Sequence, residues 1–120
     1  MLDTWLKEVK ETADSASLGM ILVHDGVVRG TSRTGERVRG MRLSYDKERL
    51  ETLVSQMRAR EGIVEIRVWI NSGELKVGDD IMLLLVAGRL RTDVLPVFEE
   101  LLSSVKKDIV REMEIDESPQ

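Results

Sequence analysis

The sequence predicts a single domain of the α+β class, in which helices pack on a mixed or largely antiparallel sheet. Segments with helical and strand-like apolar patterns follow one another in the order α-β-β-α-β-β-α. The strands have mixed character and do not form the uniform βαβ repeats of a parallel sheet. No internal repeat is visible, and 120 residues with 42% hydrophobic content can bury one core.

The chain is expected to begin with a short amphipathic helix at residues 2–12. Trp5 and Leu6 lie on its apolar side and would dock it on the domain, and Asp3 is a candidate N-cap. A loop follows, and then a continuous apolar run at 18–23. The length of this run predicts a strand that is buried on both faces.

The middle of the chain carries the clearest periodic signals. Apolar residues within 46–61 recur at helical spacing, and Gly62 would end that helix. Gly40 predicts a bulge in the strand at 38–45, which comes before this helix. Strands bounded by turn residues are expected at 38–45, 63–70, 74–77 and 81–87.

A second long helix is expected after the last of these strands. Asp93 is its candidate N-cap, and Pro96 falls in its first turn. Its final turns carry three cations, Lys106, Lys107 and Arg111. Cations at a helix C-terminus suit the helix dipole, which is the structural interpretation of these residues. A short strand at 110–115 is an alternative end to the chain.

Arg89 and Arg91 lie at the opposite end of this helix. A helix of this length spans about 25 Å at 1.5 Å per residue. Arg91 and Lys106 can therefore serve one site only if other parts of the fold, or a second subunit, bring them together. Arg91 could instead pair with Asp93, and Arg89 is interpreted as a surface or capping residue.

Residues 24–40 (HDGVVRGTSRTGERVRG) predict a flexible loop with several basic side chains. The loop is either a hairpin with solvated arginines or part of a binding site, and its glycine spacing matches neither a P-loop nor a dinucleotide fingerprint. His24 beside Asp25 is interpreted as structural or incidental, because adjacent side chains in a strand point to opposite faces. Asp79 and Asp80 are interpreted as a solvated turn rather than as metal ligands.

Composition excludes several classes of function. The formal charge of −4 argues against a general nucleic-acid binder. Because the chain has no cysteine and one histidine, we expect no metal site and no bound cofactor. The apolar runs are too short to span a bilayer, and the charged N-terminus lacks the apolar core of a signal peptide. We therefore expect a cytoplasmic protein that does not contact a membrane.

Several segments, in this order, resemble the catalytic (large) subunit of molybdopterin synthase. They are GVVRG at 26–30, GELKVGDD at 73–80 with the apolar strand after it, and an arginine followed fifteen residues later by a lysine. The likeness covers roughly residues 18–113 and implies an α/β hammerhead-like fold. It divides the chain into an N-terminal helix with its linker, a large-subunit-like domain and an acidic tail, at 1–17, 18–115 and 116–120.

This family implies a sulfurtransferase that works as a homodimer with a ubiquitin-like sulfur-carrier small subunit. The carrier's C-terminal Gly-Gly tail, which ends in a thiocarboxylate, would enter a pocket of the large subunit. Two sulfur transfers would convert cyclic pyranopterin monophosphate into the dithiolene of molybdopterin. Sulfur comes from the partner, which fits an enzyme without cysteine.

The resemblance assigns Lys106 as the catalytic residue and places Arg29 and Arg91 on two arginines of the family's site. Arg33 is a further candidate for binding the substrate phosphate, because guanidinium groups bind oxyanions in bidentate fashion. Lys106 follows an apolar residue, so partial burial is expected. Burial or neighbouring cations lower the pKa of a lysine and allow it to act as a base or a nucleophile.

Two positions depart from the family pattern. Leu90 stands where the family has a histidine, and Met113 stands where it has a second lysine; Lys107 or Arg111 could supply that charge. These departures leave two alternatives, an active but divergent synthase, or a non-catalytic or repurposed paralogue that binds a carrier tail or a phosphorylated ligand. A third alternative is a structural dimerisation domain with its tryptophans at interfaces.

Overall fold

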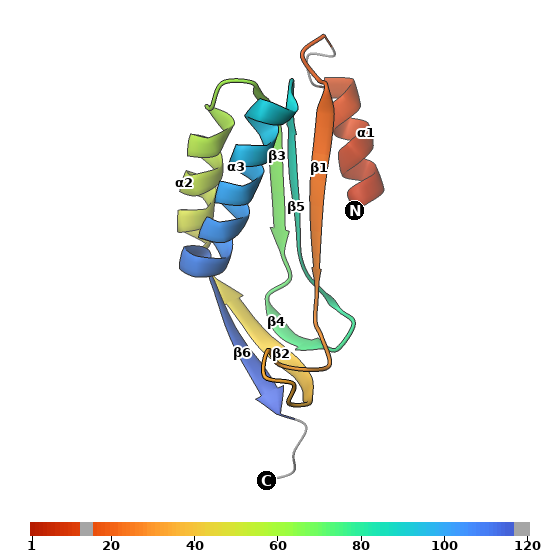
Figure 1. Ribbon diagram of the computed structural model, residues 1–120, viewed down its shortest axis with the longest axis vertical. Coiled ribbons are helices and arrows are strands. Elements are labelled where there is room, and N and C mark those ends of the chain that lie inside the picture. Colours follow the sequence, from red (N-terminus) through yellow and green to blue (C-terminus); the bar gives the residue numbers. More distant parts are fainter. Residues whose placement is uncertain (13–15, 117–120) are drawn as a thin grey trace.

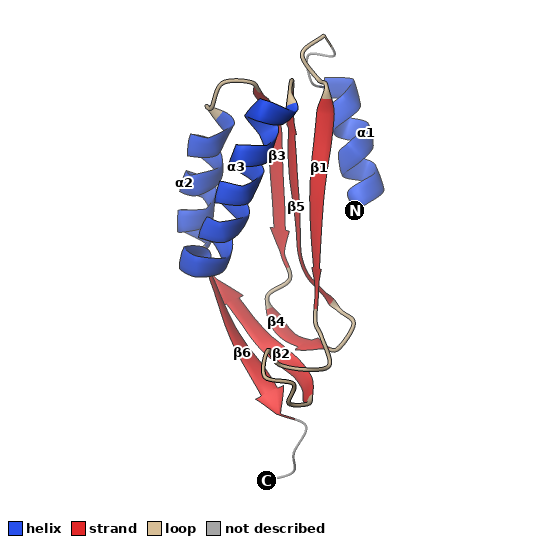
Figure 2. Ribbon diagram, viewed as in Figure 1, coloured by secondary structure: helices blue, strands red, loops and turns tan. Residues whose placement is uncertain are grey.

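The computed structural model describes residues 1–12 and 16–116 and confirms the α+β class. Its helices and antiparallel strands form one elongated domain (Figures 1 and 2). Most of the predicted linker and tail lies outside the described residues. In chain order the described elements are α1 (Leu2–Thr12), β1 (Met20–Val27), β2 (Val38–Tyr45), α2 (Lys47–Arg58), β3 (Ile63–Ile70), β4 (Gly73–Lys76), β5 (Asp80–Gly88), α3 (Arg91–Ser104), the π-helical turn η1 (Val105–Ile109) and β6 (Val110–Asp116).

The larger sheet has the strand order β1-β5-β3, and each pair is antiparallel. α2 and α3 cover one face of this sheet, and α1 lies on the other (Figure 1). β5 is the central strand, and its residues from Met82 to Gly88 are all buried. The main core lies between the sheet and the two helices, where the fully buried residues include Ile66, Leu84, Val86, Val94, Leu101 and Val105.

Helix α1 docks through the side chains that its apolar stripe predicts. Trp5 and Leu6 pack around Val9, which has no exposed surface, and all three lie in a cluster with Leu85 and Ala87 of β5. This cluster is separate from the main core because side chains along β5 alternate between the two faces of the sheet. The prediction that α1 is held on the domain by its own apolar side is confirmed.

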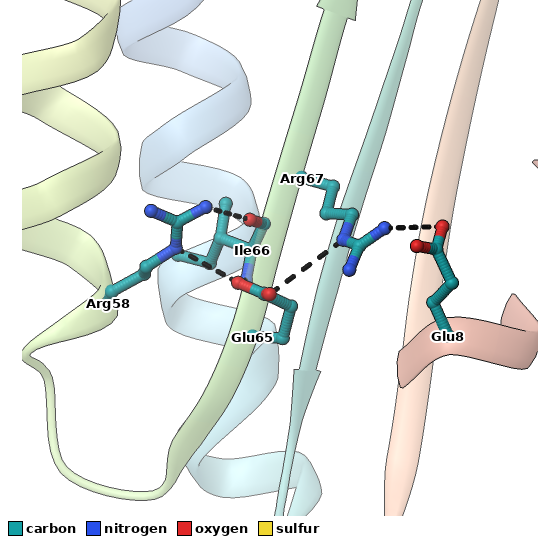
Figure 3. A network of polar contacts seen from close by, with 5 residues as sticks. All are labelled: Glu8, Arg58, Glu65, Ile66 and Arg67. Carbon is teal, nitrogen blue, oxygen red and sulfur yellow. Dashed lines mark hydrogen bonds and ion pairs between the residues drawn. The ribbon is translucent and has the colours of Figure 1, made fainter. Parts of the chain in front are cut away.

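A polar network links α2, the edge strand β3 and α1 (Figure 3). Glu65 accepts a hydrogen bond from Arg58 Nε at 2.9 Å, and Arg58 also donates to the carbonyl oxygen of Ile66 at 2.8 Å. On the other side, Arg67 lies 3.7 Å from Glu65 and forms a 2.9 Å ion pair with Glu8 of α1. The network therefore ties helices on opposite faces of the sheet to one strand.

The smaller sheet has the order β4-β2-β6 and extends beyond the helices (Figure 1). The predicted bulge is present, because the pairing of β2 with β6 shifts register between Val38 and Gly40. A Cβ atom at Gly40 would lie 2.1 Å from the carbonyl oxygen of Leu75 on β4, so a larger residue would push the two strands apart. This glycine allows β2 to pair closely on both sides.

The strands at 38–45 and 63–70 match their predicted ranges, but the burial predicted for the first strand is wrong. The apolar run at 18–23 was expected to be buried on both faces, but β1 starts at Met20, continues to Val27 and is half-buried. β1 is an edge strand, so it has a neighbouring strand on one side only. Val23 and Val27 lie on the face away from the main core and are exposed.

Helix α2 has a side-chain cap at its N-terminus, in which Asp46 accepts a hydrogen bond from the backbone N–H of Arg49 at 3.1 Å. The helix ends at Arg58, earlier than predicted, and Gly62 (φ +81°) occurs in the turn into β3. No helix in the described residues is both long enough and apolar enough to cross a membrane.

Two predicted N-caps lie inside their helices. α1 starts one residue before Asp3 and α3 starts two residues before Asp93, so Pro96 falls in the second turn of α3 rather than the first. The backbone N–H groups of Asp93 and Val94 both donate to the carbonyl oxygen of Leu90, each at 3.0 Å. The first turn of α3 therefore closes on the backbone alone, without a side-chain cap.

The last helix is also shorter than predicted. α3 ends at Ser104, the π-helical turn η1 follows, and the chain then enters β6. Lys106 and Lys107 therefore lie in the π-helical turn, and Arg111 lies in a strand rather than at a helix end. The strand expected at 110–115 as the alternative end is confirmed.

Candidate functional site

A cavity of about 480 Å³ lies at the junction of the two sheets. Its wall is built from the end of β1, the loop at 28–37, β2, the start of β5, η1 and β6. Segments that are far apart in the sequence therefore meet there. The charged residues and the histidine that line it are His24, Asp25, Arg29, Arg33, Lys106, Glu112 and Glu114.

Three of the predicted site residues converge on this cavity. Arg29 and Arg33 reach it from the loop at 28–37, and Lys106 reaches it from η1. Among the residues that the structure describes, none of these three cations takes part in an ion pair. Their charges are therefore available to a bound anion.

The local fold explains how Lys106 is presented. The first and last residues of the π-helical turn, Val105 and Ile109, are buried in the main core. The backbone N–H of Val110 closes the turn on the carbonyl oxygen of Val105. Lys106 itself is exposed, so the partial burial expected from its apolar neighbour is wrong. Single π-helical turns occur frequently at functional sites.

The other predicted site residues lie elsewhere. Arg91 is at the N-terminal end of α3, opposite the end that leads into Lys106 (Figure 1). Lys107 is exposed and does not line the cavity, and Arg111 lines a different hollow beside Met113 on β6. Leu90, at the family's histidine position, is 58% exposed at the start of α3.

The cavity contains a histidine that the sequence analysis set aside. His24 lies on β1, and its Nε2 atom is buried without a hydrogen-bond partner in the described residues. Burial lowers the pKa of His24, and the charge of Lys106 lowers this pKa further. His24 has the same strand parity as the core residues Met20 and Leu22, so extending the predicted strand beyond residue 23 would have placed it on the inner face.

The loop at 28–37 is a hairpin-like excursion, which was one of the two predicted alternatives. Thr31 and Arg37 form an isolated antiparallel bridge, and Gly35 (φ +87°) lies at the turn. Because Arg29 and Arg33 both line the cavity, the loop is also part of a candidate binding site. The two alternatives for this loop are therefore compatible.

The acidic residues at the strand entry form the expected turn. Asp79 accepts a hydrogen bond from the backbone N–H of Lys76 at 2.8 Å, and Asp80 is exposed. A hydrogen bond with Asp80 raises the pKa of Asp25 at the cavity wall. The described residues contain no cluster of three or more residues that could hold a metal ion.

The cavity is suited to an oxyanion. Two guanidinium groups and one ammonium group line one space, and guanidinium groups form paired hydrogen bonds with phosphate or carboxylate oxygens. The carboxylates of Asp25, Glu112 and Glu114 would repel an anion that approached them directly. The arrangement therefore favours a ligand that presents its anionic group to the loop and to η1.

Comparisons with known proteins agree with this fold. One similar solved structure is molybdopterin synthase from Staphylococcus aureus (18% identity, TM-score 0.76, covering 94% of this chain and 85% of that chain). Another is a MoaE protein from Burkholderia ambifaria (16% identity, TM-score 0.72, covering 100% of this chain and 86% of that chain). A third is a complex of subunits 1 and 2 of molybdopterin-converting factor from Helicobacter pylori (18%, 0.72, 99% and 85%). At sequence identities this low, the likeness to these structures shows the fold alone.

A search of the curated proteins found no match. The model of the MoaE protein family matches residues 3–108, which is most of the 120-residue chain. This match confirms the resemblance that the sequence motifs suggested. The chain belongs to the MoaE family, the family of the molybdopterin synthase large subunit in molybdenum cofactor biosynthesis.

Proposed function

We propose that this chain catalyses sulfur transfer from a thiocarboxylated carrier to cyclic pyranopterin monophosphate, forming molybdopterin. The observation that carries the proposal is the convergence of Arg29, Arg33 and Lys106 on one cavity. All three cations are free of ion pairs within the described residues. This is the charge arrangement that a substrate phosphate and a thiocarboxylate both require.

Arg29 and Arg33 are assigned to the substrate phosphate. Both lie on the same loop, so they can hold one anionic group from the same side of the cavity. Bidentate contacts would also orient the pterin, because they restrict its rotation. Correct orientation is a large part of catalysis when two bound reactants must meet.

Lys106 is assigned to the reacting thiocarboxylate. It lines the cavity from η1 and is exposed. An ammonium group at this place stabilises negative charge that develops on the carbonyl oxygen during transfer. In each transfer the thiocarboxylate sulfur forms a carbon–sulfur bond on the pterin and displaces an oxygen substituent from that carbon. Water then cleaves the bond between this sulfur and the carrier's carbonyl carbon, so the sulfur stays on the pterin and the carrier ends with a carboxylate.

The partner that we infer is a ubiquitin-like small subunit with a C-terminal Gly-Gly tail. The Helicobacter pylori relative was solved as a complex of two subunits, which supports an assembly of this kind. A glycine tail has no side chains and can enter a narrow cavity in an extended conformation. The tail would deliver its terminal thiocarboxylate to Lys106.

A second function has specific support. Leu90 and Met113, which replace a histidine and a lysine of the family pattern, are 58% and 65% exposed and lie outside the cavity. A repurposed paralogue with the same cavity would bind a carrier tail or a phosphorylated ligand without turning it over. The two functions differ in whether product forms.

A reconstitution separates the two functions. The chain is mixed with thiocarboxylated carrier and cyclic pyranopterin monophosphate, and molybdopterin is measured for the wild type, Lys106→Ala and Lys107→Ala. We expect Lys106→Ala to lower the rate by about 100-fold or more, because it removes charge stabilisation at the reacting group. Lys107→Ala is the matched control, since Lys107 is the next residue of the same turn and does not line the cavity.

Product formation by the wild type that is lost in Lys106→Ala and kept in Lys107→Ala would support the synthase. Equal rates in the two variants would remove Lys106 from the mechanism. Carrier binding without any product in the wild type would favour the repurposed paralogue.

A further inference from the structure

His24 is the one histidine of the sequence, and it lies in the wall of the candidate site. Its Nε2 atom is shielded from solvent and has no hydrogen-bond partner in the described residues. A buried polar atom without a partner destabilises the folded state. Gly26 leaves room for the ring, because a Cβ atom there would approach Nε2 to 3.3 Å. The imidazole therefore stands in the wall of the cavity with an unpaired, buried nitrogen.

The charges around this ring nearly cancel. They come from β1, the loop at 28–37, η1 and β6, and the charged side chains lining the cavity are Asp25, Arg29, Arg33, Lys106, Glu112 and Glu114. Three are cations and three are anions, so the lining is formally neutral when His24 is neutral. A phosphate that enters the cavity adds negative charge that this lining does not balance.

We propose that binding of an oxyanion in this cavity protonates His24, and that the charge of the imidazolium then stabilises the bound anion. The inference deepens the proposed function, on which it rests for the identity of the phosphate ligand. It adds His24 to Arg29, Arg33 and Lys106 as a residue that recognises the ligand. It also makes recognition of the ligand dependent on pH.

The direction of the effect follows from the surroundings of the ring. In the empty cavity, burial and the charge of Lys106 lower the pKa of His24 below its ordinary value of 6.5, so the ring is neutral at pH 7. The charge of Asp25 raises the pKa of His24, but this effect is smaller than that of burial and that of Lys106. A bound anion stabilises the charged ring and raises the pKa. Anion affinity should therefore increase as the pH falls from the pKa of the bound form to the pKa of the empty form.

The single histidine allows a direct test in the full chain. The imidazole Hε1 resonance is followed by NMR from pH 5 to pH 9 in sodium sulfate, and again in sodium chloride at the same ionic strength. Sulfate is the probe because it does not change its own charge in this range. We expect sulfate to raise the pKa of His24 by about one unit, which corresponds to tenfold tighter sulfate binding to the protonated chain.

Two variants give an independent measurement. The sulfate affinity of the wild type should rise about tenfold as the pH falls through the two pKa values measured for His24 with and without sulfate. His24→Gln keeps a hydrogen-bond donor and His24→Phe keeps a ring, but neither takes up a proton. Both should bind sulfate with little dependence on pH over this range. If one variant fails to fold, the other still gives the comparison.

A His24 titration that is the same in sulfate and chloride overturns the inference, as does an unchanged pH dependence of affinity in the variants. These outcomes do not depend on turnover. A protein that makes no molybdopterin but shows the sulfate effect would contradict the proposed function alone. Normal turnover without the sulfate effect would contradict the role of His24 alone.

Discussion

At the scale of single residues, the cavity requires a guanidinium group and not only a positive charge at position 29. Arg29 shares the wall with Arg33 and has no ion pair within the described residues, so its fork of donors is free for a phosphate. Arg29→Lys keeps the charge and loses the paired hydrogen bonds. We expect it to raise KM for the pterin about tenfold, the effect of losing one charge-assisted hydrogen bond.

Arg39→Lys is the control for this measurement. Arg39 is an exposed arginine of β2 that does not line the cavity, so the same change should leave KM and kcat unaltered. Equal KM values for the wild type and Arg29→Lys would show that Arg29 does not hold the phosphate.

Sequence reasoning found part of the residue set. The family resemblance assigned Arg29 and Lys106, and Arg33 was added because a guanidinium group in the same loop can bind phosphate. His24 was set aside because its neighbour Asp25 was expected on the opposite face of the strand, yet both residues line the cavity. Arg91, also assigned by the resemblance, lies at the opposite end of α3 from Lys106, and the sequence does not show what would bring the two together.

At the scale of elements, α1 is held on the domain more strongly by apolar contact than by its ion pair. Val9 has no exposed surface, whereas the Glu8 side chain in the pair with Arg67 is 46% exposed. Val9→Ala should lower the free energy of unfolding by about 2 kcal/mol, through lost burial and the cavity left behind. Glu8→Gln should lower it by less than about 1 kcal/mol, because solvent weakens the pair.

Urea unfolding, followed by tryptophan fluorescence, measures both changes. Trp5 lies on α1 beside the mutated positions, so its emission reports whether the helix remains docked. A larger effect for Glu8→Gln than for Val9→Ala would mean that the polar network, and not the apolar cluster, holds α1 in place.

Elements with a strong local pattern were predicted well, and elements decided by distant contacts were not. The strand at 63–70 alternates clearly and has its predicted bounds, and α2 has a side-chain cap that can be identified from the sequence. The end of α3 is different. Burial of Val105 and Ile109 in the main core and the pairing of β6 with β2 change the helix into a π-helical turn and then a strand. Neither contact is visible in the local periodicity.

At the scale of the whole molecule, the site exists because two sheets meet. β6, the last element described, pairs with β2, and this brings the acidic residues 112 and 114 to a cavity whose basic loop follows β1. The α+β class follows from the order of the elements. The strand orders β1-β5-β3 and β4-β2-β6 depend on pairing between residues far apart in the chain, so the cavity could not be predicted from the sequence.

The position of Arg91 raises the question of whether one chain forms a complete site. Arg91 is the first of the fourteen residues of α3, and the π-helical turn that carries Lys106 follows the last, a distance of about 20 Å along the helix axis. An arginine side chain does not span that distance. If Arg91 acts in the reaction, it acts in the cavity of another protomer, and the homodimer implied by the family resemblance is the arrangement that we propose.

Mixed dimers test this arrangement. Arg91→Ala and Lys106→Ala chains, each nearly inactive alone, are unfolded together, refolded and assayed for molybdopterin formation. A mixed dimer would have one complete site, in which the Arg91→Ala chain supplies Lys106 and the partner's Arg91 comes from the Lys106→Ala chain. Random pairing makes half of the dimers mixed, so we expect about one quarter of the wild-type activity. If both residues act within one chain, no mixed dimer has a complete site and the mixture stays inactive; full activity of Arg91→Ala alone would remove Arg91 from the site.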